Sequence, residues 1–112
     1  MKQFQPLSNT EKHYISPEKG KTQGKARLIE RNGLVYLQPG TELHPPEMTM
    51  SDKNKSRRLE VVKLGYGYVD PSTQNIILTK EYQINSIKNA WRLVMGSNDG
   101  NEKFRDINDG MI

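Results

Sequence analysis

The sequence predicts a small α+β domain: one antiparallel sheet of two hairpins with two helices on one face, in the order β-β-α-β-β-α. Two β-prone segments are each interrupted by turn residues, and two other segments combine helix-capping residues with apolar residues at helical spacing. The length, 112 residues, suits one domain. We expect a flexible tail over residues 1–25, the domain over residues 26–107 and a C-terminal tail over residues 108–112.

The first hairpin is predicted from the segment KARLIERNGLVYLQ. Asn32-Gly33 supplies the positive φ angles that a tight turn requires, and β-prone residues flank it on both sides. We expect strands at Ala26–Glu30 and Leu34–Gln38. Pro39-Gly40 ends the second strand, and the Pro-Pro pair in TELHPPEMTM favours an extended connection.

The first helix is predicted from the segment SDKNKSRRLEVVKLG. Ser51 is a capping residue, the first turn is acidic, and Gly65 follows the last helical residue. The N-terminal half of the segment is basic. Its C-terminal half is expected to be the dry end, since the apolar residues gather there. These apolar residues are Leu59, Val61, Val62 and Leu64.

The second hairpin and the second helix follow in YGYVDPSTQNIILTKEYQI and the residues after it. Tyr66–Val69 and Asn75–Thr79 are the expected strands, and Asp-Pro-Ser-Thr supplies the turn between them. Ser86 then caps a helix with apolar residues at i, i+3, i+4 and i+7, and Gly96 ends it. The apolar stripe of this helix consists of Ile87, Ala90, Trp91 and Val94.

The composition restricts the classes of function. A net charge of +4 and a pI near 9.4 favour polyanionic partners. The absence of cysteine excludes disulfides, thiolate metal sites and a cysteine nucleophile, and it fits a reducing cytoplasm, where we expect the protein to act. No segment has the length and apolar character of a membrane span, so we expect no membrane partner.

Catalytic motifs are missing from the sequence, which has no P-loop, no Gly-x-Ser-x-Gly and no Gly-x-Gly-x-x-Gly. His44 and Glu47 lie close together, but two prolines stiffen the spacer and the other histidine, His13, falls in the predicted tail. We therefore expect no enzyme activity, no metal site and no cofactor.

Four segments carry a resemblance to a known family: NGLVYLQPGTEL, RRLEVVKLG, NIILTKEYQINS and INSIKNAWRLVMGSNDGNEKFRD. They resemble the domain of unknown function appended to GIY-YIG nucleases and to restriction or methylase polypeptides, which is related to the RAMA domain of restriction enzymes and adenine methylases. The resemblance covers about residues 24–106. It departs from the family at Ser86–Ala90, which lacks a proline and a second small residue, and at Phe104, where a tryptophan is usual.

The resemblance implies an accessory module rather than a catalyst, of a family proposed to recognise nucleic acid, with modified DNA as one candidate. No nuclease or methylase is joined to the module in this chain, so the sequence would be a stand-alone module from a phage or another mobile element. A DNA-binding protein linked to restriction and modification is therefore the first functional hypothesis.

Ten polar or basic residues are the candidate DNA contacts, because cations neutralise phosphates and exposed amides contact phosphates or base edges. They are Lys53, Lys55, Arg57, Arg58 and Lys63 in the first predicted helix, and Lys88, Arg92, Asn98, Lys103 and Arg105 in and after the second. The alternative for the first group is a solvated helix face, which is what charge runs usually are.

We also predict roles for the aromatic residues and for the last loop. Trp91 lies on the apolar stripe and is expected in the core, where its N–H needs a partner. The loop Gly96–Asn101 is expected mainly to close the core and secondarily to contact DNA. Tyr66 and Tyr68 could either stack on bases or pack against the protein.

Two alternative functions stay open: modulation of a host protein, and a role in assembly. Oligomeric state is not predicted.

Overall fold

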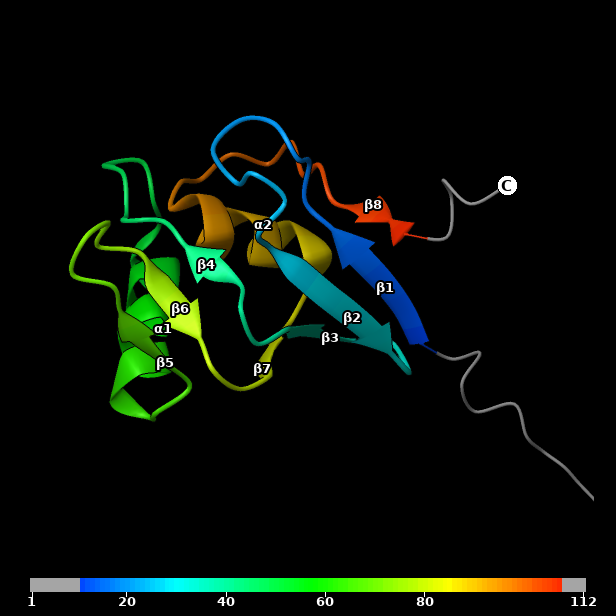
Figure 1. Ribbon diagram of the computed structural model, residues 1–112, viewed down its shortest axis with the longest axis horizontal. Helices are drawn as coiled ribbons and strands as arrows, with labels where there is room; N and C mark the ends of the chain where they lie inside the picture. Colours follow the sequence, from blue (N-terminus) through cyan, green and yellow to red (C-terminus); the bar gives the residue numbers. More distant parts are fainter. Residues whose placement is uncertain (1–10, 108–112) are drawn as a thin grey trace, which may run out of the picture.

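The computed structural model describes residues 11–107, which form eight strands and two helices (Figure 1). In chain order these are β1 (Glu11–Ile15), β2 (Arg27–Arg31), β3 (Leu34–Leu37), β4 (Glu42–Leu43), α1 (Asp52–Lys63), β5 (Gly67–Val69), β6 (Ile76–Leu78), β7 (Tyr82–Ile84), α2 (Ile87–Met95) and β8 (Arg105–Asp106).

The strands form two antiparallel sheets. The larger sheet has the order β7-β3-β2-β1-β8, and the smaller sheet has the order β4-β6-β5. Helix α2 packs against β3, β7 and β4, whereas α1 packs against β5 and α2. The α+β class is thus confirmed, but each helix belongs mainly to a different sheet.

Both predicted pairs of neighbouring strands form and are antiparallel. Asn32 and Gly33 adopt positive φ angles of 53° and 81°, and Leu28 pairs with Leu37 across β2 and β3. In the second pair, Tyr68 lies opposite Ile77. The prediction of a single sheet is wrong, because the two pairs belong to separate sheets, the first extended by β7 and β1 and the second by β4. The sequence did not predict this arrangement, because strands that are distant in the sequence pair with the open edges of each hairpin.

Residues 11–25, predicted to be part of a flexible tail, contain strand β1. Tyr14 pairs with Leu28, and the backbone N–H of Ser16 donates to the carbonyl of Ala26 at 2.9 Å. The guanidinium of Arg31 also donates to the Glu11 carboxylate at 2.7 Å. The charged residues of EKHYI hide the strand in the sequence, and its edge backbone groups are satisfied by pairing. Residues 1–10 and 108–112, also predicted to be tails, lie outside the described part.

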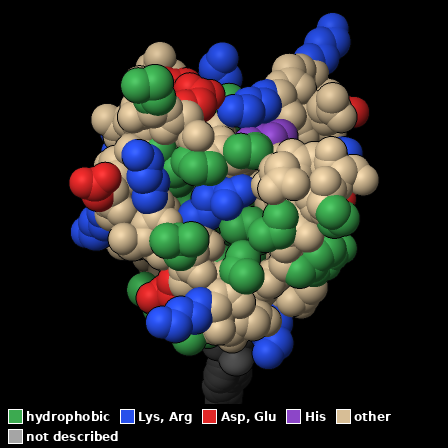
Figure 2. Space-filling view, turned by 90° about the vertical axis from the view of Figure 1, so that its left-hand side faces the viewer, with side chains coloured by type: hydrophobic (Ala, Val, Ile, Leu, Met, Phe, Trp, Pro, Cys, Tyr) green, Lys and Arg blue, Asp and Glu red, His purple; other side chains and the backbone are tan. Residues whose placement is uncertain are grey.

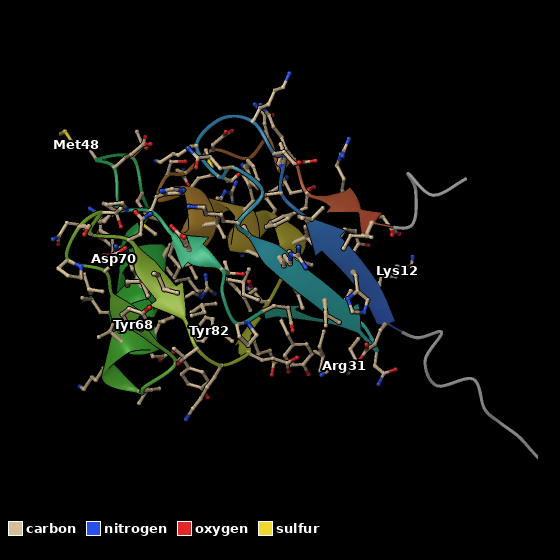
Figure 3. The ribbon with its side chains drawn as sticks, viewed as in Figure 1. Lys12, Arg31, Met48, Tyr68, Asp70 and Tyr82 are labelled. Atoms are coloured by element: carbon tan, nitrogen blue, oxygen red, sulfur yellow. The ribbon has the colours of Figure 1, made fainter. Side chains whose placement is uncertain are left out.

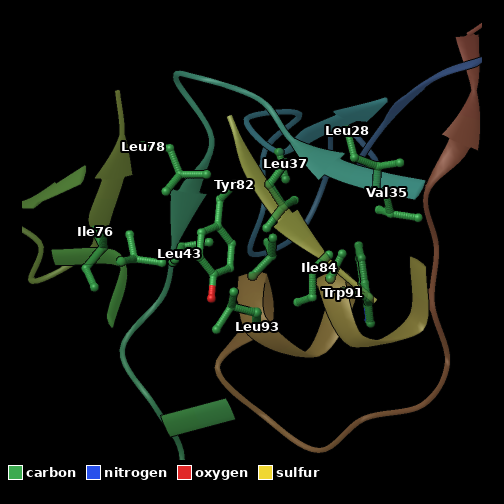
Figure 4. Packing of buried hydrophobic residues seen from close by; sticks show 14 of the residues in the cluster. Leu28, Val35, Leu37, Leu43, Ile76, Leu78, Tyr82, Ile84, Trp91 and Leu93 are labelled. Carbon is green, nitrogen blue, oxygen red and sulfur yellow. The ribbon is translucent and has the colours of Figure 1, made fainter. Parts of the chain in front are cut away.

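The core joins the two sheets through α2 (Figure 4). Leu28, Val35 and Leu37 project from the larger sheet, and Ile76 and Leu78 project from the smaller one. Leu43 and Tyr82 fill the junction between the sheets, and Leu93 of α2 packs from the side of the helix. One continuous apolar cluster therefore serves both sheets.

The predicted helix ends are confirmed. The Ser51 and Ser86 hydroxyls accept from the N–H groups of Asn54 and Asn89, three residues further on. Gly96 has a left-handed φ of 72° and ends α2. These caps satisfy backbone groups that have no partner inside the helix.

Candidate nucleic-acid interface

Three lysines of α1 present charge without a partner. Lys53 and Lys63 are exposed and Lys55 is half-buried. Within residues 11–107 none of the three makes an ion pair or a hydrogen bond through its side chain. Each is therefore available to a phosphate at little desolvation cost.

The two arginines of α1 are used inside the protein. Arg57 donates to the side-chain oxygen of the buried Asn54 at 2.7 Å. Arg58 donates to the carbonyl oxygen of Gln74 at 2.9 Å and, more weakly, to that of His44 at 3.4 Å. Partial burial lowers the pKa of Arg58 below its usual value. Arg58 thus fastens α1 to two loops, and a charge reversal there would perturb the fold as well as any contact with DNA.

The predicted contacts in α2 and in the loop after it also include both free side chains and a side chain that is bound inside the protein. Lys88 is exposed and has no partner among the described residues. Arg92 is half-buried, donates to the Asn89 side-chain oxygen at 3.2 Å, and has a terminal nitrogen close to Gly100. Asn98 is exposed beside the loop that contains Thr49. Arg92 therefore supports the last loop, while Lys88 and Asn98 are free to bind.

The last loop closes the core as predicted. The Asp99 carboxylate accepts from the N–H of Asn101 at 2.9 Å, and the Ser97 hydroxyl accepts from the N–H of Asp99 at 3.3 Å. Phe104 then packs edge to face on Trp91, with ring centroids 5.3 Å apart. The short polar bonds shape the loop, and the aromatic pair anchors its far end.

Arg105 begins β8, on the other side of α2 from α1, and Lys103 lies in the segment before β8. Both side chains are exposed and have no partner in the described part. Arg105 stands opposite Ile15, which stands opposite Arg27, so two arginines flank Ile15 on one face of the larger sheet. In Figure 1, β8 and α1 are at opposite sides of α2. The structure does not gather the ten predicted contacts into one compact patch.

Four glutamates pair with basic residues outside the set of predicted DNA contacts. Within residues 11–107, Arg31 pairs with Glu11 and Glu81, Lys25 pairs with Glu42, and Lys21 pairs with Glu47. None of these pairs involves a predicted DNA contact. The predicted cations consequently keep their charge uncompensated by close carboxylates.

The predicted dry end of α1 is largely exposed. Val61 is buried, but Leu59 and Leu64 are 71% and 58% exposed, and Val62 is partly exposed. Figure 2 shows hydrophobic side chains gathered around a basic side chain at this end of the molecule. The prediction is wrong for these three residues because only one side of α1 meets the core. We call Leu59, Val62 and Leu64 the apolar face of α1.

The tyrosines around β5 have separate environments. Tyr66 packs edge to face on Tyr82 with ring centroids 5.5 Å apart, whereas Tyr68 is exposed on β5 (Figure 3). Tyr82 donates to the Glu60 carboxylate at 2.9 Å, and burial together with this bond raises the pKa of Tyr82 to about 12. Tyr66 and Tyr68 therefore form no joint stacking surface.

The side chains of His44 and Glu47 have different partners and do not form a joint site. Burial, with the positive charge of Lys21 nearby, lowers the pKa of His44 below its usual value. Glu47 instead pairs with Lys21 at 3.1 Å. No group of three or more His, Cys, Asp or Glu residues suited to a metal ion occurs in residues 11–107. The same residues include no helix long and apolar enough to cross a membrane.

Comparison with protein-family models, curated proteins and solved structures finds no match for this chain. The resemblance to nuclease-associated and methylase-associated domains therefore stays a prediction from the sequence.

Proposed function

We propose that this chain is a non-enzymatic DNA-binding module, of the accessory kind that its resemblance to restriction and methylase domains implies. One observation supports the proposal above the others. Six predicted cations have no carboxylate or hydrogen-bond partner among residues 11–107, whereas Glu11, Glu42, Glu47 and Glu81 pair with other basic residues. The six are Lys53, Lys55, Lys63, Lys88, Lys103 and Arg105.

The proposed contact is with the phosphate backbone rather than with base edges. Lys63 and Leu59 lie four residues apart on the exposed side of α1, so an apolar side chain occupies the side that a recognition helix would offer to a groove. Lysine is a compact charge on a flexible chain, which suits backbone neutralisation more than directional recognition of a base. Binding of this type releases counterions and weakens steeply as salt rises.

The test is fluorescence anisotropy with a labelled duplex across a salt series. A matched pair of variants isolates the role of free charge: Lys63→Gln removes an unpaired lysine, and Lys25→Gln removes an exposed lysine that faces Glu42 at 3.5 Å. We expect Lys63→Gln to lower the log–log salt slope by about one phosphate and Lys25→Gln to change it less. Absence of wild-type binding at low salt would overturn the proposal.

A second candidate function is binding to a host protein, and the apolar face of α1 favours it. Exposed apolar side chains that lie close together mark interaction surfaces more often than isolated ones do. The double variant Leu59→Ser/Leu64→Ser should lose a partner that co-purifies with the wild type after nuclease treatment. If the wild type retains no partner after that treatment, this candidate fails.

A further inference from the structure

The indole N–H of Trp91 has no hydrogen-bond partner in the described residues, although the side chain is only 3% exposed. Buried N–H groups in folded proteins almost always donate to an oxygen, and leaving one unpaired costs about 1–3 kcal/mol. An acceptor from outside residues 11–107 would remove this penalty.

Trp91 lines a small pocket in which lysines gather. The pocket has a volume of about 140 Å³, and its wall includes Lys19, Lys21 and Lys103 together with the turn at Gly20. Lys19 and Lys21 come from the connection between β1 and β2, and Lys103 comes from the segment before β8. Together with α2, which contains Trp91, three parts of the chain that are distant in sequence line the pocket.

Two of the three lysines are available to a ligand. Lys21 is already bound, since its ammonium donates to the Met95 carbonyl at 2.7 Å and to Glu47 at 3.1 Å. Lys19 and Lys103 are exposed and have no partner in the described part. No carboxylate lines the pocket. The wall thus includes two uncompensated cations and the tryptophan whose buried N–H has no partner in the described residues.

From these contacts we infer that the Trp91 pocket binds a phosphate group, with the indole N–H as donor and Lys19 and Lys103 as counter-charges. A phosphate offers several acceptor oxygens at once, which matches donors that approach from separate elements. The volume is below the 300–1,000 Å³ or so of pockets that enclose whole small molecules, so the site takes a phosphate and not the rest of a nucleotide.

Phosphate could come from free inorganic phosphate or from a nucleic-acid backbone, and the pocket is distinct from α1. A failure of the α1 lysines to bind DNA therefore leaves this inference intact. A failure of the pocket to bind phosphate likewise leaves the α1 lysines available, because Lys103 is the one residue that the pocket shares with the proposed DNA contacts.

The chain contains a single tryptophan, so its indole N–H gives one resonance in a ¹H–¹⁵N correlation spectrum. We would titrate the ¹⁵N-labelled protein with inorganic phosphate at constant ionic strength, and separately with a short duplex. The pocket variant is Lys19→Gln/Lys103→Gln. The control is Lys12→Gln/Lys80→Gln, which removes the same charge from exposed lysines that do not line the pocket.

We expect a saturable shift of the indole resonance on addition of phosphate, weakened about tenfold or more in the pocket variant and retained in the control. A shift with the duplex alone, lost in the pocket variant, supports the site and assigns the phosphate to a nucleic-acid backbone. No saturable shift with either ligand, or equal weakening in both double variants, would overturn the inference.

Discussion

The two helices are attached to the same core by different forces. Helix α2 buries four of its nine residues, all apolar, and Gly96 ends it against the loop at Pro45. Helix α1 buries two of its twelve residues, Asn54 and Val61. Polar contacts hold the rest of α1, through Arg58 to two loops and through Glu60 to Tyr82.

Helix α2 is therefore part of the packed scaffold, whereas α1 contributes mainly to the surface. Packing of apolar side chains stabilises α2 and fixes Trp91 and the last loop, whereas α1 leaves its lysines and its apolar face to the solvent. Changes in α2 should therefore act on stability, and changes on the outer side of α1 should act on binding.

Truncation of a leucine in each helix should give the largest contrast. Leu93 is fully buried in α2 and Leu59 is exposed on α1. Leu93→Ala should lower the free energy of unfolding by about 2–5 kcal/mol because it leaves a cavity. Leu59→Ala should change it by less than about 0.5 kcal/mol. Urea denaturation followed by circular dichroism measures both, and equal losses would contradict the division.

The glycines that follow the two helices provide a second matched pair. Gly65 and Gly96 have φ angles of 80° and 72°, but a Cβ at Gly65 meets open space, whereas one at Gly96 would collide with the carbonyl oxygens of Pro45 and His44. Gly65→Ala should lower the stability by about 1 kcal/mol through backbone strain alone. Gly96→Ala should lower it by about 2–4 kcal/mol, because the clash adds to the strain. Thermal unfolding of both variants checks the order, and a smaller loss at Gly96 would contradict it.

The hydrogen bond from Tyr82 connects α1 to the larger sheet. Tyr82→Phe keeps the ring and removes the bond to Glu60, so we expect a loss of about 1 kcal/mol in the free energy of unfolding. Tyr36→Phe is the control, because the Tyr36 ring lies under Arg31 while its hydroxyl has no hydrogen-bond partner in residues 11–107. Chemical denaturation should show almost no loss for the control. Similar values for the two variants would show that the bond to Glu60 adds nothing.

A small pH dependence should come from His44. Burial is the main cause of its lowered pKa, followed by Lys21, while Asn75 and Glu42 act in the opposite direction. The unfolded chain then binds more protons than the folded chain between the two pKa values, so stability rises with pH toward about 6.5, the ordinary histidine value. Below that pH the stability contributed by neutral His44 is lost. His44→Gln should flatten the curve just below about pH 6.5, with His13→Gln as the control for removing one histidine.

The sequence predicted the parts of the fold that depend on neighbouring residues. Asn32-Gly33 fixes its turn, Ser51 and Ser86 cap their helices, and Gly96 ends α2 through local backbone geometry. The division into two sheets was missed because β1, β4, β7 and β8 depend on pairing with distant strands. Short strands such as Glu42–Leu43 carry too few residues for an alternating pattern to stand out.

The candidate contacts were predicted by residue type but not by role. Lys53 and Arg58 look equivalent in the sequence, yet only the structure shows that Arg58 is bound to two carbonyl oxygens. The sequence does not point to Lys19, because its segment lacks periodicity and is predicted to be a tail. The prediction that a buried Trp91 N–H needs a partner was the one signal in the sequence that pointed to the pocket.

The proposed DNA-binding activity is tested most directly by the salt dependence of duplex binding in two triple variants, Lys53→Gln/Lys55→Gln/Lys63→Gln and Lys88→Gln/Lys103→Gln/Arg105→Gln. The first removes the free charge of α1, and the second removes that of α2 and the segment after it. We predict wild-type binding with a slope of several phosphates and a decrease of about two to three in at least one variant, while both variants keep wild-type stability. Undiminished slopes in both variants would contradict the proposal.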